Sequence, residues 1–231
     1  MGQVPSAAEQ DYLKQIYCLH EEGGRATTQA LADRLGVKPP SVTAMLKHLA
    51  ADPTGPYVRH TPYHGAELTD KGLAVALEMV RHHRLIEQFL AELLDVPWDR
   101  VHAEAERLEH ALSEELEERI AAKLGYPTRD PHGDPIPTRE GTIDTNGSVA
   151  LSALPVGATA TVVRVPDGDP ALLQYLGSLG LVPGAAVVVE TVAPYGDVLT
   201  LRVGEVTQTL GAAIARRVRV APTRGETQRH V

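Results

Sequence analysis

Apolar residues in the first part of the chain recur at the spacing of short amphipathic helices. The first apolar face spans residues 12–19, and Gly23-Gly24 ends the helix that carries it. A second face spans 31–35, and a third spans 42–49. Gly36 separates the second face from the third. The order helix, glycine turn, helix predicts a helix-turn-helix motif.

The residues that follow the third helix have the pattern of short β-strands. Residues 57–60 and 66–69 are two short β-type runs, and the intervening 61–65 contains proline and glycine. A hairpin that follows a helix-turn-helix indicates a winged module, which we place at residues 1–72. The third helix would then be the element that enters a DNA major groove.

In the remainder of the chain, the spacing of the apolar residues changes twice. Long amphipathic helices are predicted over residues 73–94 and 101–124, and together they define a helical domain at 73–126. A proline- and glycine-rich linker at 127–150 follows. Beyond it, β-type runs predict a small barrel over residues 151–222, with a disordered tail at 223–231; the runs are 161–165, 186–190, 198–203 and 218–220. The predicted fold class is mainly α with a β C-terminal domain.

Composition excludes several kinds of protein. The net charge of −8 argues against coating nucleic acid by bulk charge, and 4% aromatic residues argue against serial base stacking. One cysteine rules out an internal disulfide and a cysteine-based metal site. Neither a secretion signal nor a long apolar run is present, so we expect a cytoplasmic protein that does not enter the membrane.

Small, polar and basic residues occupy the outward positions of the third predicted helix, as a helix that enters the major groove requires. Basic side chains on the predicted wing would reach phosphates or the minor groove. The alternative is a three-helix module that mediates protein contacts only. The candidate DNA-contact residues are Pro39, Pro40, Ser41, Thr43, Lys47, Arg59 and His64.

Imidazole and carboxylate side chains are concentrated on the two long helices. His83 and Glu87 are four residues apart, and a second group follows the break near Pro97; its members are His102, Glu106, Glu109 and His110. Asp11 of the first helix could join them. Nitrogen and oxygen donors of this kind predict a site for a divalent transition metal.

Two other interpretations of these residues remain open. They could be solvated pairs on a helix surface, which stabilise a helix by only about 0.3–0.5 kcal/mol each. They could also form a hydrolytic metal site with Glu87 or Glu106 as general base. The His-Glu-x-x-His order of zinc hydrolases is absent from them.

Five segments together resemble the diphtheria toxin repressor family of metal-dependent bacterial transcription regulators, and most of all its manganese transport regulators with a third domain. The segments are residues 9–17, 35–43, 83–87, 101–110 and 133–137. The resemblance implies a winged helix that binds a palindromic operator as a homodimer. It also implies a C-terminal SH3-like, FeoA-like barrel.

The resemblance also assigns metal ligands residue by residue. One site would use Asp11, Glu106, Glu109 and His110. The other would use His83, Glu87 and His102, with a barrel carboxylate from Asp169 or its neighbour Asp167. Glu106 and Asp11 stand where iron-sensing members carry cysteine and methionine, so these oxygens favour Mn²⁺, with Fe²⁺ as the alternative.

Two positions depart from the resemblance. Lys14 stands where manganese regulators can carry a glutamate ligand, and Pro-Thr-Gly-Pro between Asp52 and Tyr57 is an addition before the wing. The predicted function is a metal-dependent repressor of metal-uptake genes, with no small-molecule substrate. The alternatives are a metal-dependent hydrolase, or a metal buffer with a non-functional DNA module.

Overall fold

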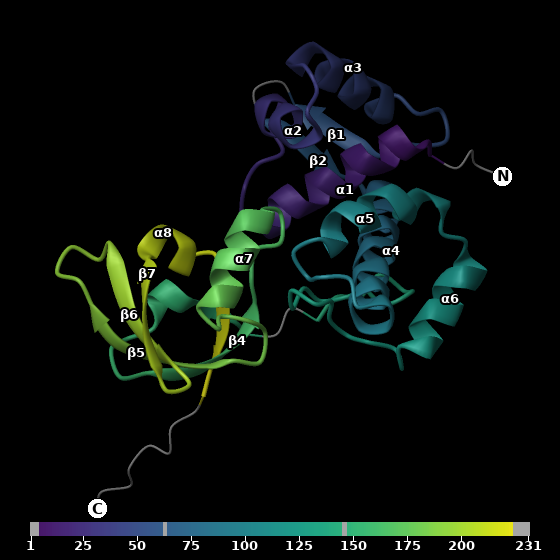
Figure 1. Cartoon of the computed structure of the whole chain (residues 1–231). Coiled ribbons are helices and arrows are strands. Elements are labelled where there is room, and N and C mark those ends of the chain that lie inside the picture. The colour runs from purple at the N-terminus through teal and green to yellow at the C-terminus, as the bar shows by residue number, and fades with distance from the viewer. Residues whose placement is uncertain (1–4, 62–63, 145–146, 224–231) are drawn as a thin grey trace, which may run out of the picture. The chain divides into compact units, whose positions relative to one another are not determined.

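The computed structural model describes residues 5–61, 64–144 and 147–223, which form two compact units (Figure 1). The first unit contains residues 1–83, 108–117 and 137–143, and the second contains 84–107, 118–136 and 144–231. The predicted disordered tail lies outside the described residues from position 224 onward. Among the described residues, no helix is both long and apolar enough to cross a membrane.

The first unit begins with the winged helix-turn-helix that the sequence predicts. It consists of α1 (Ala7–Glu21), α2 (Thr28–Leu35), α3 (Pro39–Ala50), β1 (Val58–Thr61) and β2 (Gly65–Leu68). Ser6 starts α1 with a capping box to Glu9, and Gly36 ends α2 in the left-handed conformation at φ +64°. Leu13, Leu31 and Leu46 are fully buried in one core beneath these elements. The predicted helical faces are therefore the ones that pack together.

The helical segment after the wing differs from its prediction. α4 (Asp70–Leu94) is continuous, but the single helix predicted over 101–124 is divided into α5 (Val101–Leu108), the 3₁₀ turn η1 (Glu109–Ala111) and α6 (Glu114–Lys123). The chain is extended at Leu112. The Ser113 hydroxyl then accepts a 3.3 Å hydrogen bond from the Leu116 N–H, which starts a new helix. Glu109 and His110 consequently lie on a short turn.

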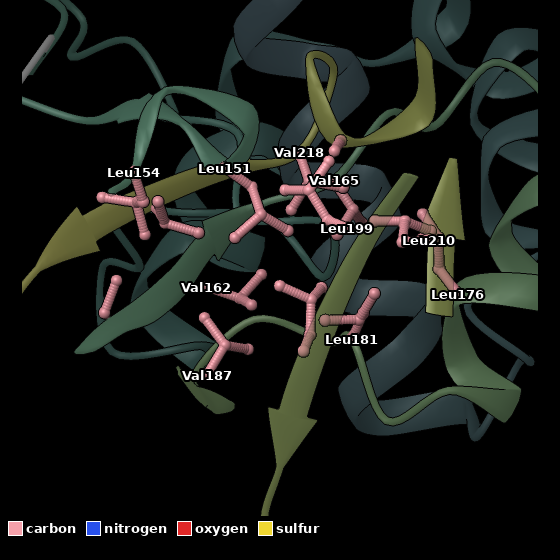
Figure 2. Close-up of a cluster of buried hydrophobic side chains, with 14 of the residues drawn as sticks. Leu151, Leu154, Val162, Val165, Leu176, Leu181, Val187, Leu199, Leu210 and Val218 are labelled. Atoms are coloured by element: carbon pink, nitrogen blue, oxygen red, sulfur yellow. The ribbon is translucent and has the colours of Figure 1, made fainter. Parts of the chain in front are cut away.

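The second unit contains a six-stranded sheet with the strand order β3-β8-β4-β5-β6-β7, in which all pairs are antiparallel. The sequence predicted β4 (Thr159–Arg164), β5 (Ala186–Val192), β6 (Val198–Val203) and β8 (Arg219–Pro222), and it missed β3 (Val149–Ala150), β7 (Val206–Gly211), α7 (Pro170–Ser178) and α8 (Ala212–Ala215). A short 3₁₀ turn, η2 (Leu151–Ala153), follows β3. Figure 2 shows the side chains that fill the hydrophobic core of this β-sheet domain, including Leu151, Val162 and Leu199. The sheet forms the predicted small β-domain.

The part of the predicted linker that lies before residue 137 is an ordered turn of the second unit. Asp130 Oδ1 accepts hydrogen bonds from the N–H groups of His132 and Asp134, each at 2.9 Å. The carbonyl of His132 accepts a 2.9 Å hydrogen bond from the Val165 N–H. Side-chain and backbone bonds therefore fix a segment whose composition is typical of a flexible connection, and they leave His132 fully buried.

Glu117, which is buried at the start of α6, is expected to contribute pH-dependent stability. It accepts a 2.5 Å hydrogen bond from Arg81 Nε and lies 3.2 Å from His82 Nε2. Burial acts to raise the pKa of Glu117, but these two partners outweigh it and lower the pKa from 4.5 to about 2. Because the folded pKa is the lower one, the stabilisation is complete above pH 4.5 and is lost as the pH falls towards 2.

We therefore expect Glu117→Gln to lower the free energy of unfolding by about 2 kcal/mol at pH 7. Urea denaturation at several pH values measures this difference, which should shrink between pH 4.5 and pH 2. Glu118→Gln, on the neighbouring residue, is the control for loss of a charge. A deficit that stays constant down to pH 2 would argue against this ion-pair network as its cause.

Candidate metal centres

The first cluster of possible metal ligands lies in the first unit and joins α1 to η1. Asp11, Glu109 and His110 each offer one donor atom, and these atoms lie within 4.8 Å of one another. His110 Nε2 lies 2.8 Å from Asp11 Oδ1, and His110 Nδ1 lies 2.8 Å from Gln10 Oε1. Burial raises the pKa of Asp11, and the His110 charge opposes it. The donors are two carboxylates and an imidazole, a set that suits Mn²⁺ or Fe²⁺.

Both oxygens of the fully buried Glu109 carboxylate have a cationic or imidazole partner. Lys14 Nζ donates to Oε1 at 2.5 Å, and His83 Nδ1 lies 2.5 Å from Oε2. Burial acts to raise the pKa of Glu109, but the His83 hydrogen bond and the Lys14 charge outweigh it, so the pKa lies below its usual value. The glutamate is thus held as an anion, the form that binds a metal. His83, predicted as a ligand of the other site, also contacts Glu109 through Nδ1.

The second cluster lies in the second unit and consists of Glu87, His132 and Asp167, whose donor atoms also lie within 4.8 Å of one another. Glu87 and His132 are both fully buried. His132 Nε2 donates a 2.7 Å hydrogen bond to the Trp98 carbonyl, which directs Nδ1 towards Glu87 Oε2 at 3.8 Å. A backbone carbonyl that fixes one ring nitrogen while the other faces a carboxylate is typical of metal-binding histidines.

The charge of Glu87 also controls the protonation of His132. Burial acts to lower the pKa of His132, but Glu87 and Asp130 outweigh it and raise the pKa to about 9. A pKa of about 9 favours the imidazolium form at neutral pH, with Nδ1 3.8 Å from Glu87 Oε2. Metal binding at this cluster would release that proton.

His102 and Glu106 also belong to the second unit. His102 Nδ1 lies 3.1 Å from Glu87 Oε1 and 3.8 Å from Asp167 Oδ2. His102 Nε2 lies 3.8 Å from Glu106 Oε1. The predicted pairing of Glu87 with His102 is therefore present, and Glu106, which was predicted to join Asp11, has His102 as its neighbour in this unit.

The barrel carboxylate beside this cluster is Asp167, whereas Asp169 has a different role. Asp169 caps α7, and its Oδ1 accepts hydrogen bonds from the N–H groups of Ala171 and Leu172 at 3.0 and 3.3 Å. The sequence pattern allowed both aspartates and favoured Asp169. His132 was not among the predicted ligands, although a histidine immediately before the family segment 133–137 was a usable signal.

The candidate DNA-contact residues lie on the outer side of the winged module. Pro39 and Pro40 begin α3, where missing N–H groups cost least. The hydroxyl of Thr43 donates a 3.2 Å hydrogen bond to the Pro39 carbonyl, so Thr43 would present its methyl group rather than a free hydroxyl. The remaining candidates are exposed: Ser41, Lys47, Arg59 and His64.

The extra residues before the wing form a closed loop. Lys71 Nζ donates to Asp52 Oδ1 at 2.9 Å, to Thr54 Oγ1 at 2.6 Å and to the Gly55 carbonyl at 3.0 Å. The ammonium also lies 3.7 Å from the centre of the Tyr57 ring. The addition is therefore anchored to the start of α4 and leaves β1 paired with β2 in regular register.

A winged helix together with clusters of nitrogen and oxygen donors defines the class of metal-dependent DNA-binding regulators. Three family models match successive parts of the chain. The N-terminal DNA-binding domain of iron-dependent repressors matches residues 6–66, their metal-binding and dimerisation domain matches 69–138, and the FeoA domain matches 149–222.

Whole proteins of the same class are similar over most of the chain. The iron-dependent repressor IdeR of Mycobacterium tuberculosis is 37% identical over 222 residues, covering 90% of this chain and 94% of the relative. The diphtheria toxin repressor of Corynebacterium efficiens is 36% identical over 126 residues, 54% of each chain. A solved structure of a manganese-dependent transcriptional repressor complex with manganese is 38% identical with a TM-score of 0.86, covering 93% of this chain and all of the other.

The chain belongs to the diphtheria toxin repressor family of metal-dependent transcriptional repressors. Its relatives regulate transcription, so it is not an enzyme, and the hydrolase alternative is set aside. The predicted winged helix and SH3-like domain are both confirmed.

Proposed function

We propose that this protein is a homodimeric repressor in the cytoplasm that binds a palindromic operator when loaded with Mn²⁺, with Fe²⁺ as the second candidate. The observation that carries the proposal is the cluster of Asp11, Glu109 and His110, which lies between the first helix of the DNA-binding module and η1. Its donors include no sulfur, which favours the harder ions. A metal buffer would bind the same ions without any effect on DNA.

The proposed mechanism is a metal-controlled geometry of the two reading helices. Asp11, Glu109 and His110 would hold the metal, which supplies a divalent positive charge between α1 and η1. Asp11 would hold the metal from the DNA-binding module, and Glu109 and His110 would hold it from the helical domain. The metal would thereby fix the orientation of the DNA-binding module. Two modules about 34–36 Å apart, one turn of DNA, fit successive major grooves.

We further propose a second metal site at Glu87, His132 and Asp167, with His102 beside it. This proposal replaces Asp169 by Asp167, because Asp169 is engaged as a helix cap. A metal there would take Nδ1 of His132 and join α4 to two segments of the second unit. Such a site would stabilise the second unit rather than orient the DNA-binding module.

His132→Gln, which preserves side-chain volume, is expected to weaken Mn²⁺ binding at the second site at least about tenfold. Isothermal titration calorimetry should then detect two Mn²⁺ ions per wild-type chain and one in the variant at moderate concentrations. His20→Gln, on an exposed histidine of α1, is the matched control. Two ions bound with unchanged affinities by His132→Gln would exclude His132 as a ligand.

Lys47→Ala is expected to weaken DNA binding to a similar degree for all sequences, because an exposed lysine on α3 would contact phosphate rather than a base. The slope of log affinity against log salt concentration should decrease by about 1. Filter binding at several salt concentrations measures it, and Lys123→Ala, on the exposed end of α6, is the control. An unchanged slope would place Lys47 away from the DNA.

A further inference from the structure

Lys14 is buried beside the first cluster of possible metal ligands, and the proposed mechanism gives this lysine no role. It is 3% exposed and lies on α1 one turn after Asp11, so one helix supplies both a ligand and a cation. Its Nζ lies 2.5 Å from Glu109 Oε1, and the Glu109 side chain is fully buried. The ammonium thus stands at an oxygen that the proposed metal would use.

We propose that Lys14 is a built-in cation that neutralises Glu109 in the metal-free protein and must be displaced before a metal binds. The inference rests on the proposed function of the cluster. It makes Lys14 a residue that sets metal affinity by competition, without being a ligand. The metal-free protein would then be a stable state with its own ion pairs.

The pairing of charges in the cluster supports this role. Glu109 Oε1 is taken by Lys14 and Oε2 by His83, while Asp11 Oδ1 lies 2.8 Å from His110 Nε2. A divalent ion at Oε1 would meet the ammonium at short range, where like charges inside a protein repel strongly. Binding therefore requires the ammonium to move away from Glu109.

Lys14 has a route for that movement. Its flexible stem of four methylene groups can carry the ammonium away from Glu109 while the helix remains in place. The cluster is open on the side of Asp11, whose side chain is 35% exposed, and His110 is 22% exposed. The displaced ammonium would leave Glu109 towards this exposed side of the cluster.

Removal of the ammonium should have opposite effects on the two states. A buried carboxylate that loses its partner is an uncompensated charge, which destabilises the metal-free protein. A bound metal then supplies the missing positive charge and no longer competes with an ammonium. Affinity should increase as the stability of the metal-free form decreases.

The test compares Mn²⁺ affinities of full-length Lys14→Gln and Lys14→Arg by competition with a fluorescent chelator. Lys14→Gln should bind Mn²⁺ about tenfold tighter or more, at the site that Asp11→Asn removes. Lys14→Arg keeps the charge and should remain within about threefold of wild type. Lys123→Gln, which removes an exposed lysine, should change nothing.

Thermal unfolding provides a second readout. Metal-free Lys14→Gln should melt below wild type and should gain more from saturating Mn²⁺. Lys14→Met, which keeps the apolar stem, replaces Lys14→Gln in both measurements if the latter does not fold. Unchanged or weaker Mn²⁺ binding by the folded variant would overturn the role of Lys14. Failure of Asp11→Asn to alter Mn²⁺ binding would overturn the proposed function instead.

Discussion

Replacement of Asp11 by alanine is expected to shift the Mn²⁺ response of operator binding to at least about 100-fold higher Mn²⁺ concentration and to leave the fold intact. Asp11 provides the only carboxylate from the winged module among the described ligands of the first cluster. Loss of a group that merely orients a ligand costs about 10- to 100-fold in metal affinity. Loss of the ligand itself should therefore cost at least about 100-fold. Operator binding measured against free Mn²⁺ concentration reports this shift.

The control for Asp11→Ala is Asp33→Ala, which removes an exposed aspartate of α2 in the same unit. Its Mn²⁺ response should match that of wild type. Circular dichroism of both variants verifies that the winged module is folded. A folded Asp11→Ala protein that still responds to the same Mn²⁺ concentration would show that the first cluster does not couple metal to DNA.

Gly133→Ala is expected to destabilise the second unit by about 3 kcal/mol or more. Gly133 has φ +89°, and an added Cβ would lie 1.9 Å from the Val163 carbonyl oxygen. Neither the turn nor the strand can yield easily, because Val165, which directly follows β4, donates a 2.9 Å hydrogen bond to the carbonyl of His132, the residue before Gly133. The variant should therefore displace His132 and weaken Mn²⁺ binding at the proposed second metal site as well.

Urea denaturation measures this loss of stability. Gly184→Ala separates the cost of a positive φ from the cost of the steric contact. Gly184 has φ +91°, but an added Cβ there would meet no heavy atom within 4 Å, so its substitution should cost only about 1 kcal/mol. The difference between the two variants is the effect of the close approach to Val163. Equal costs at the two glycines would mean that the turn does not pack tightly against β4.

Local periodicity was sufficient to predict the winged module and most of the sheet. The faces of α1, α2 and α3 are determined by spacings within each helix, and the capping residues Ser6 and Gly36 mark their ends. The ligand types were also predictable, because imidazole and carboxylate side chains are concentrated at short spacings in residues 83–87 and 102–110. These features depend on neighbours in the sequence.

Features that depend on tertiary packing were not predictable in the same way. The break at Leu112 follows a helical pattern that continues across it, and a serine at position 113 is only a weak start signal. The role of His132 depends on the Trp98 carbonyl, which is distant in the sequence. Lys14 was evident as a departure from the family pattern, but its burial against Glu109 required the structure.

The most direct test of metal-controlled DNA binding is the fluorescence anisotropy of DNA fragments from upstream of metal-uptake genes in the source genome. The metal-free protein would be titrated with Mn²⁺, anaerobic Fe²⁺ and then a chelator. We predict saturable binding to one fragment over scrambled DNA, activated by Mn²⁺ at least as well as by Fe²⁺ and reversed by the chelator. Metal uptake without selective DNA binding would contradict this function and favour the metal-buffer interpretation.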